Sequence, residues 1–242
     1  MPGNATPATP LSPLLDVLRA DEAFASAVDV PPAALTAPTS AVPALLAAGP
    51  DRGGPTVVIT ATGADASDLA EALAAYVDRD TIARFPSWET LPHERLSPRA
   101  DTVAERIATL RRVAHPEEVA EVTGLPPARF VIAPVRAVLQ PVIPGLADLE
   151  PVAVRKGEMR DLSELVAALA EAAYERVDMV ERRGQFAVRG GIVDVFAPTD
   201  PHPTRIEFFG DEVDSLRAFS VADQRSLEER DALWAPPCRE MV

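Results

Sequence analysis

Short apolar runs alternate with amphipathic stretches through the first half of the chain. The run Thr56–Thr60 is short, apolar and β-branched, as a buried parallel strand is. Between such runs, apolar residues recur at helical spacing, with Leu69, Leu73 and Val77 on one face. This alternation predicts an α/β unit, a parallel sheet covered by helices. The expected elements are a helix that starts near Leu14 and ends before Pro31, helices over Asp65–Val77 and Asp101–Ala114, and strands over Thr56–Thr60, Ile82–Phe85 and Phe130–Ala133.

The pattern changes after about Pro134, where alternating apolar and polar positions take over. An amphipathic helix is expected over Leu162–Tyr174, with Ser163 as its cap. Gly210-Asp211 is expected to form a tight turn between two strands. The second unit is therefore predicted to be α+β, with antiparallel strands over Val152–Val154, Gln185–Val188, Ile192–Phe196, Thr204–Phe209 and Val213–Phe219.

These patterns divide the chain into four stretches. Residues 1–13 are a leader rich in Pro, Ala and Thr that is expected to be mobile, and residues 14–135 form the α/β unit. Residues 136–221 form the α+β unit, with the boundary between about Ala133 and Glu150. Residues 222–242 are charged and show no complete element, so they are expected to be the truncated start of a segment that returns to the first unit.

The composition is that of an acidic globular protein. The 242 residues carry a formal net charge of −14, which argues against the chain as a whole coating DNA, because phosphate neutralisation needs a surplus of Lys and Arg. The single cysteine, Cys238, cannot form an internal disulfide, which fits a reducing compartment. No apolar stretch of about 20 residues and no secretory signal is present. We expect a cytoplasmic protein without a membrane partner.

The loop after the first strand is the obvious position for a nucleotide site. Strand, glycine loop and helix form the right context for a phosphate cradle. A phosphate-binding loop also uses a Lys to reach the phosphates and a Ser or Thr to hold magnesium. Here the loop has one glycine, no lysine, and two aspartates that would repel phosphate. The sequence therefore predicts a degenerate phosphate loop, with Asp65 as a helix cap, made of Thr62, Gly63, Asp65 and Ser67.

Other catalytic chemistry has little support in the sequence. The three histidines, His93, His115 and His202, lie far apart, and none has metal-ligand spacing with Cys or Glu, so solvated loop positions are expected. The carboxylates within residues 211–214 are expected to form a solvated turn rather than a metal site. No Gly-x-Ser-x-Gly motif and no Cys/His nucleophile pair is present. We expect no catalytic residue and no metal ligand.

Arginines gather in the second unit of this otherwise acidic chain. Because alternate residues of a strand share a face, Arg205 and Glu207 are expected to project together, away from the core. Such a face suits a partner with complementary charges. The alternative is a solvated face with intramolecular ion pairs, each worth little, and the pattern alone somewhat favours it. The arginines are Arg176, Arg182, Arg183, Arg189, Arg205 and Arg217.

Long stretches of the chain resemble a known family. The segment Phe85–Leu110 (FPSWETLPHERLSPRADTVAERIATL) looks like the characteristic N-terminal segment of bacterial transcription-repair coupling factors (Mfd). Two further segments, Arg183–Phe196 (RGQFAVRGGIVDVF) and Arg205–Leu216 (RIEFFGDEVDSL), resemble both that family and the UvrA-binding domain of UvrB. The resemblance extends loosely over nearly the whole chain except the leader.

The resemblance implies a degenerate helicase-like α/β domain with an inserted antiparallel α+β domain like domain 2 of UvrB. UvrB has a further arginine where this chain has Ala187, so that contact is not carried over. The phosphate loop of UvrB and its tyrosine-rich DNA-clamping hairpin also lack counterparts, since Thr62–Asp68 has no Lys and Phe85–Asp101 has no Tyr. Matched residue by residue, the UvrA-contacting positions are Arg176, Arg189, Arg205 and Glu207.

The implied function is that of a non-catalytic module that binds UvrA and recruits nucleotide excision repair to lesions where RNA polymerase has stalled. The fragment would use no cofactor, because ATP and magnesium serve motor domains outside this chain in the family. RNA polymerase and DNA would likewise be contacted only through regions outside the chain, and other domains of the parent protein would mask the UvrA-binding face. Two alternatives stay open: a helicase-like domain with residual nucleotide binding, and a DNA-binding module that uses the arginines directly.

Overall fold

The structure is a computed structural model that describes residue 9 and residues 11–29, 34–90 and 97–240. The chain forms two compact units, residues 1–85 with 126–139 and residues 86–125 with 140–242. The sequence predicts one boundary near residues 133–150, whereas the units divide at three points, because residues 86–125 group with the second unit. Most of the expected leader, and His93, lie outside the described residues.

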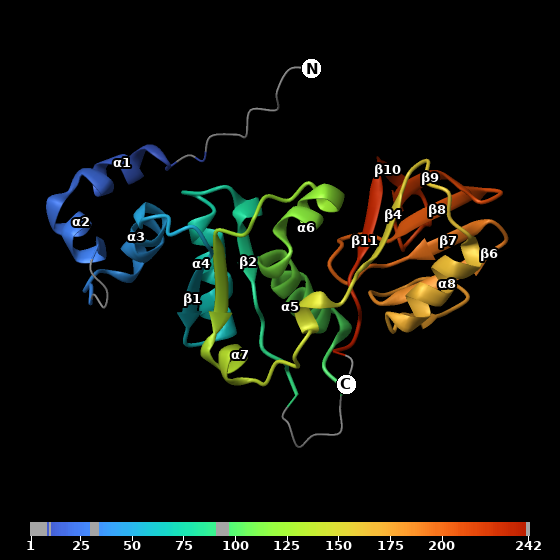
Figure 1. Cartoon of the computed structure of the whole chain (residues 1–242), viewed down its shortest axis with the longest axis horizontal. Helices are drawn as coiled ribbons and strands as arrows, with labels where there is room; N and C mark the ends of the chain where they lie inside the picture. Colours follow the sequence, from blue (N-terminus) through green and yellow to red (C-terminus); the bar gives the residue numbers. More distant parts are fainter. Residues whose placement is uncertain (1–8, 10, 30–33, 91–96, 241–242) are drawn as a thin grey trace. The chain divides into compact units, whose positions relative to one another are not determined.

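The first unit is built on a three-stranded parallel sheet, which confirms the strand prediction (Figure 1). The strands are β1 (Thr56–Thr60), β2 (Ile82–Arg84) and β3 (Phe130–Pro134), with β3 in the centre and buried along its whole length. The expectation that Thr56–Thr60 is buried is wrong, because β1 is an edge strand whose Val57 and Ile59 are 59% and 56% exposed. Helix α4 (Gly63–Leu73) follows β1 and packs its Leu73 into the same core as Ile132 of β3. The apolar centre of the sheet thus forms the core of the unit.

Helices near the start of the chain complete this core. α1 (Pro13–Ala20) and α2 (Glu22–Asp29) stand where the sequence predicts one helix, because the backbone of Asp21 is extended and its carboxylate accepts the Phe24 N–H at 2.8 Å. The sequence pattern missed α3 (Val42–Ala48), a short Ala-rich helix that a 3₁₀ turn η1 (Thr39–Ala41) introduces. The remaining elements of the unit are η2 (Arg79–Thr81) and α7 (Val135–Leu139).

The second unit contains a six-stranded sheet in the order β10-β9-β8-β7-β6-β5 (Figure 1). Its four central strands confirm the predicted antiparallel hairpins: β6 (Gln185–Arg189), β7 (Ile192–Val195), β8 (Thr204–Phe209) and β9 (Glu212–Phe219). Gly210 and Asp211 form the predicted two-residue turn, and Gly210 has the positive φ of 64° that such turns need. β5 (Glu175–Arg176) adds parallel to β6, and β10 (Ser226–Arg230) adds antiparallel to β9.

Helix α8 (Leu162–Glu171) covers the inner surface of this sheet with Leu165 and Leu169, which share a core with Phe186, Val193 and Ile206. Its cap is Asp161 and not Ser163: the carboxylate of Asp161 accepts the backbone N–H groups of Ser163 at 2.7 Å and of Glu164 at 3.1 Å. The helix also ends before the predicted Tyr174, because Ala173 turns the chain with a positive φ of 63°.

The prediction that residues 222–242 hold no complete element is wrong. They contain β10 and also β11 (Ala232–Ala235), which pairs antiparallel with β4 (Val152–Arg155) as a two-stranded ribbon. Both strands belong to the second unit. That unit also contains α5 (Ala100–Ala114), α6 (Pro116–Thr123) and the turn η3 (Leu146–Asp148), although the sequence pattern assigns the helix over Asp101–Ala114 to the first unit.

Candidate functional site: the charged face of the six-stranded sheet

One surface of the six-stranded sheet carries charged side chains at neighbouring positions on its central strands. The strand register sets Asp194 beside Arg205 and Arg205 beside Arg217, while Glu207 lies between Ile192 and Ser215. The alternate residues of the same strands, such as Val193 and Ile206, point into the core. We call this surface the charged face: Arg189, Asp194, Arg205, Glu207, Ser215 and Arg217.

Asp194 lies at the centre of the charged face and holds two arginines. Arg205 forms a bidentate pair with it, in which Nε lies 2.7 Å from Oδ1 and Nη2 lies 2.9 Å from Oδ2. Arg189 Nη2 lies 2.6 Å from the same Oδ2. These two side chains cover the carboxylate, and Asp194 is 1% exposed. Sequence reasoning missed Asp194; the available signal was an acid at the outward position of an otherwise apolar strand.

Arg205 is fixed on several sides. Its guanidinium lies 4.6 Å from the ring centre of Phe219, and its Nη2 also donates to Gln224 Oε1 at 3.3 Å. The pKa of Arg205 is raised above its ordinary value, chiefly because the side chain donates hydrogen bonds to Asp194. Arg205 is therefore a well-ordered cation with part of its surface open to solvent.

Glu207 lies one row further along the charged face. Its Oε2 accepts the Ser215 hydroxyl at 2.8 Å and lies 3.7 Å from Arg217 Nη2. The expectation that Arg205 and Glu207 project together is confirmed, because Ile206 between them is fully buried. The charged face therefore presents a cationic region around Arg189 and Arg205 and a partly neutralised acid beside it.

An exposed aromatic residue extends the charged face at the end of β8. A bulge lies between Glu207 and Phe208, and Phe208 packs against the core. Phe209 stands opposite Glu212 and is 80% exposed. Sequence reasoning did not single out Phe209, although alternation from Arg205 and Glu207 places an apolar residue at an outward position there. A large exposed aromatic beside charged groups is typical of a protein-binding surface.

Arg176 stands apart from the other predicted site residues. In β5, Glu175 pairs with Gln185 of β6, whereas Arg176 pairs with the buried Phe186. Since Gln185 shares its side of β6 with Arg189, Glu175 and not Arg176 belongs to the side of the charged face. The structure thus brings together Arg189, Arg205 and Glu207. It places the exposed Arg176 on the opposite side of the sheet.

The remaining residues of the arginine group are used within the unit. Arg182 lies 3.6 Å from Glu175, and Arg183 donates to the Asp200 carbonyl at 3.0 Å while lying over the Phe196 ring. Ala187 is buried in a small apolar cluster with Val177, Val180, Phe196 and Val221. Ala187 lies opposite Asp194 on the same side of β6 as Arg189, so the position at which UvrB carries another arginine is covered here by an apolar cluster on the side of the charged face.

The loop after β1 is the start of a helix. Thr62 is the N-cap of α4: its Oγ1 accepts the Asp65 N–H at 3.1 Å, and the Asp65 carboxylate accepts the Thr62 N–H at 3.0 Å. Asp65 therefore takes part in capping as predicted, although the cap position itself is Thr62. The Ser67 hydroxyl donates to the Gly63 carbonyl at 3.1 Å, and a Cβ on Gly63 would meet no atom within 4 Å beyond its chain neighbours and the backbone of its own helix. The polar side chains of this loop thus stabilise the start of the helix. A side chain at position 63 would also find free space, so no neighbouring group requires a glycine there.

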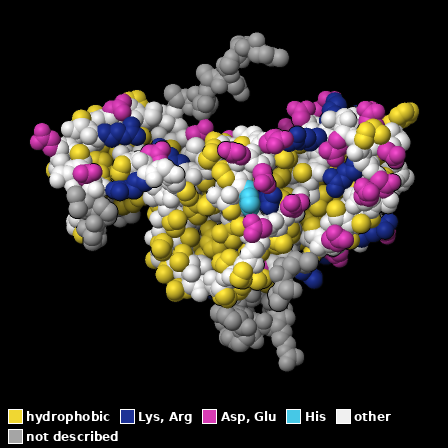
Figure 2. All heavy atoms as spheres, viewed as in Figure 1, with side chains coloured by type: hydrophobic (Ala, Val, Ile, Leu, Met, Phe, Trp, Pro, Cys, Tyr) yellow, Lys and Arg dark blue, Asp and Glu magenta, His cyan; other side chains and the backbone are white. Residues whose placement is uncertain are grey.

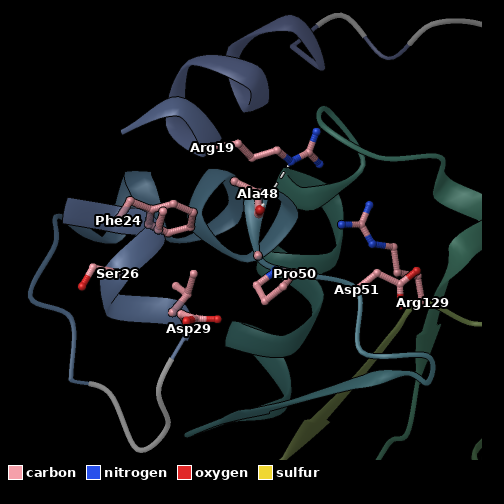
Figure 3. Close-up of a pocket in the computed structure, with 11 residues that line it drawn as sticks. Arg19, Phe24, Ser26, Asp29, Ala48, Pro50, Asp51 and Arg129 are labelled. Atoms are coloured by element: carbon pink, nitrogen blue, oxygen red, sulfur yellow. Dashed lines mark hydrogen bonds between the residues drawn. The ribbon is translucent and has the colours of Figure 1, made fainter. Parts of the chain in front are cut away.

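A hollow of about 920 Å³ in the first unit is lined by α1, α2, the end of α3 and Arg129 (Figure 3). Arg19 Nε lies 3.4 Å from the Ala48 carbonyl and Arg129 Nη2 lies 2.8 Å from the Ala47 carbonyl. Both arginines therefore bind the C-terminal end of α3, where cations are favourable. Burial, and then the charge of Arg19, lower the pKa of Arg129. Asp29 and Asp51 also line the hollow, so it is not a uniformly cationic site.

Within the described ranges, no group of three or more His, Cys, Asp or Glu residues is arranged to hold a metal ion. His115 lies in the linker between α5 and α6 and is partly exposed, in line with the expected loop position, and its Nε2 also lies 2.8 Å from Asp148 Oδ1. His202 and the acids of the 211–214 hairpin are exposed, as expected. No helix of the described part of the chain has the length and apolar character needed to span a membrane.

Comparison with known proteins places these features in a family. Residues 152–240 match the family described as "UvrB interaction domain", a range that contains the whole charged face. The chain is 48% identical over 248 aligned residues, covering all of this chain, to the transcription-repair-coupling factor of Mycobacterium bovis. It is 31% identical over 188 residues to that of Escherichia coli, covering 77% of this chain.

The chain spans only part of these relatives, 20% of the Mycobacterium bovis protein and 15% of the Escherichia coli protein. The transcription-repair-coupling factor of Bacillus subtilis is 29% identical over 189 residues, again with 15% of its length covered. Residues 152–240 thus match the UvrB interaction domain family, and the chain along its whole length is similar to about a fifth of a transcription-repair-coupling factor.

Proposed function

We propose that this chain is a non-catalytic, UvrB-like module that binds UvrA through the charged face and so recruits nucleotide excision repair to lesions where RNA polymerase has stalled. One observation carries the proposal: three of the four positions that the UvrB resemblance marks as UvrA contacts, Arg189, Arg205 and Glu207, lie together on one surface. Phe209 adds an exposed aromatic anchor beside them.

The first unit supports the non-catalytic part of the proposal. The loop that would bind phosphate in a helicase-like domain is engaged in a capping box, and it has no lysine. We therefore propose that this region keeps a degenerate helicase fold and uses neither ATP nor magnesium. Translocation, and contacts with RNA polymerase and DNA, would belong to regions of the parent protein outside this chain, and one of those regions would mask the charged face.

The charge distribution argues against direct DNA binding as the main role. Arg189 and Arg205 share Asp194, and Arg217 lies beside Glu207, so much of the positive charge is offset within the face. On the side of the molecule in view, Figure 2 shows acidic and basic side chains interspersed over the second unit. A surface of mixed sign suits a protein partner better than a phosphate backbone.

The experiment is calorimetric titration of the chain with UvrA, for the wild type and for single variants. Arg189→Glu should weaken binding by about tenfold or more, because reversal replaces an attractive pair with a repulsive one. Phe209→Ser should weaken it comparably without unfolding, because the ring is exposed in the free chain. Arg79→Glu, an exposed charge reversal in the first unit, is the matched control and should leave the affinity unchanged.

Arg176→Glu tests the fourth position separately. A loss of affinity there would mean that the UvrA contact extends around the β5 edge of the sheet. Unchanged affinity in the Arg189 and Phe209 variants together would contradict the proposed surface. If the chain instead binds DNA alone, with affinity that falls steeply as salt rises, the DNA-binding alternative replaces the proposal.

A further inference from the structure

Asp194 is an unusual acid for the solvent side of a sheet. It is 1% exposed, and its two oxygens accept three hydrogen bonds from two guanidinium groups, at 2.6, 2.7 and 2.9 Å. A buried carboxylate is unfavourable unless it is paired and hydrogen-bonded, and here both conditions hold. The strand register brings this about, because Asp194 of β7 is directly opposite Arg205 of β8 and next to β6, whose end carries Arg189.

The two arginines differ in how much of their surface they leave open. The Arg205 side chain is 20% exposed and is also held by Phe219 and Gln224. The Arg189 side chain is 50% exposed, and among the described residues Asp194 is the hydrogen-bonding and ion-pair partner found for it. Asp194 therefore determines where the Arg189 guanidinium lies, and it keeps two like charges close together at the surface.

Holding an arginine in place before a partner arrives matters for affinity. A free arginine side chain samples many rotamers, and ordering it on binding opposes association. An ion pair that already fixes the guanidinium removes most of that cost. The pair also leaves the arginine cluster with a net positive charge, since one carboxylate faces two guanidinium groups.

We infer that Asp194 is a positioning residue: it preorganises Arg189 and Arg205 for the partner without touching the partner itself. This inference rests on the proposed function, because it assigns a role to Asp194 at the same binding surface. Its burial beneath the two arginines excludes Asp194 as a contact residue in the described conformation. What the partner meets is the pair of guanidinium groups.

The test is a double-mutant cycle on UvrA affinity in the full chain. Asp194→Asn keeps the size of the side chain and removes its charge, and Arg189→Ala removes the positioned cation. We expect Asp194→Asn to weaken UvrA binding by about tenfold, and Arg189→Ala to have a much smaller effect when combined with Asp194→Asn than in the wild type. Asp231→Asn, which removes an exposed acid in the same unit, is the control for net charge and should bind as the wild type does.

The non-additivity is the readout that a merely structural role would not produce. If Asp194 supported folding alone, the two substitutions would weaken binding independently and their effects would multiply. If the Asp194→Asn variant is unfolded at the titration temperature, the same cycle is run with Asp194→Glu, which keeps the charge and displaces it by one methylene. If the effects of Asp194→Glu and Arg189→Ala on UvrA affinity then multiply, the inference is overturned.

The outcomes for the inference and for the proposed function can be told apart. Normal UvrA affinity in Arg189→Glu and Phe209→Ser would reject the proposed surface as a whole. If those variants lose affinity while Asp194→Asn binds as the wild type does, the surface stands and the positioning role of Asp194 is rejected.

Discussion

Trp88 and Glu240, 152 positions apart in the sequence, are joined by a hydrogen bond in which the indole Nε1–H donates to Oε1 at 3.0 Å. The same carboxylate oxygen lies 2.7 Å from Arg106 Nε, and the Arg106 guanidinium lies 5.0 Å from the centre of a Trp88 ring. The Arg106 side chain is 0% exposed and that of Glu240 is 7% exposed. The last described residue thus ties the end of the chain to α5 within the second unit.

Breaking this buried pair should destabilise the second unit strongly. Glu240→Ala removes the carboxylate that pairs with the buried Arg106 Nε, and breaking a buried pair in this way typically costs about 3–5 kcal/mol. The measurement is urea unfolding followed by Trp fluorescence. Glu229→Ala, which removes a 75%-exposed acid lying 3.7 Å from Lys156, should change stability by no more than about 0.5 kcal/mol. Equal losses in the two variants would show that the Arg106 pair contributes no more than a surface contact.

The loop after β1 should behave as a helix cap and not as a nucleotide site. Thr62→Ala removes the side chain that accepts the Asp65 N–H, and we expect it to cost about 1 kcal/mol. ATP with magnesium should leave the melting temperature of the wild type unchanged and should not be hydrolysed above the blank rate, with or without DNA. A rise in melting temperature that disappears in Ser67→Ala would instead reveal a working phosphate site.

Arg205 should matter for folding as well as for binding. An arginine on the outer side of a strand looks like a surface residue, whose replacement usually changes stability by about 0.5 kcal/mol or less. Its contacts with buried Asp194 and with the Phe219 ring contradict that view. Arg205→Glu sets a second carboxylate against Asp194 and should cost about 3 kcal/mol or more. Thermal and urea unfolding check this, with exposed Arg176→Glu as the comparison; equal stability of the two variants would contradict the central role of Asp194.

Cys238 should make the stability of the second unit depend on alkaline pH. Burial raises the pKa of its thiol from 9.0 to about 12. Between these values the unfolded thiol has lost its proton and the folded one keeps it, so unfolding releases a proton and stability falls as pH rises across that window. Unfolding curves at about pH 8 and about pH 10.5 should show this fall, and Cys238→Ala should make it smaller. An unchanged pH dependence in the alanine variant would mean that other groups produce it.

The same burial should protect the thiol from reagents. In the native chain at about pH 8, alkylation of Cys238 should be at least about a hundred times slower than in urea, because the reactive thiolate is scarce and covered. Mass spectrometry of iodoacetamide-treated samples measures both rates. Comparable rates would show that the end of the chain opens readily.

Hydrophobic spacing was a good guide where each element buries one side. It predicted the four central antiparallel strands, because Val193 or Ile206 alternates with outward residues there, whereas the three parallel strands were predicted from their short apolar runs. It failed for β10, whose sequence SLEER lies at the edge of the sheet and is largely exposed. It also failed for α3, since seven residues are too few to show helical spacing.

The candidate site was predictable only in part. Alternation placed Arg205 and Glu207 on one face, because that depends on a single strand. The role of Asp194 depends on which residues of three strands lie side by side, and that register is set by turns and by the core rather than by Asp194 itself. The position of Arg176 likewise depends on β5, a strand of two residues that no periodicity indicates.

The β4–β11 ribbon has a consequence for how the matched segment is joined to the rest of the chain. The matched family range begins at Val152, the first residue of β4, and β11 returns to pair with that strand, Ala235 opposite Val152. The two ends of the domain therefore leave side by side, and a host chain needs only one short gap to accommodate all of it. The matched segment thus enters and leaves at one place, next to the point where Trp88 and Arg106, from outside that segment, hold Glu240 within the same unit.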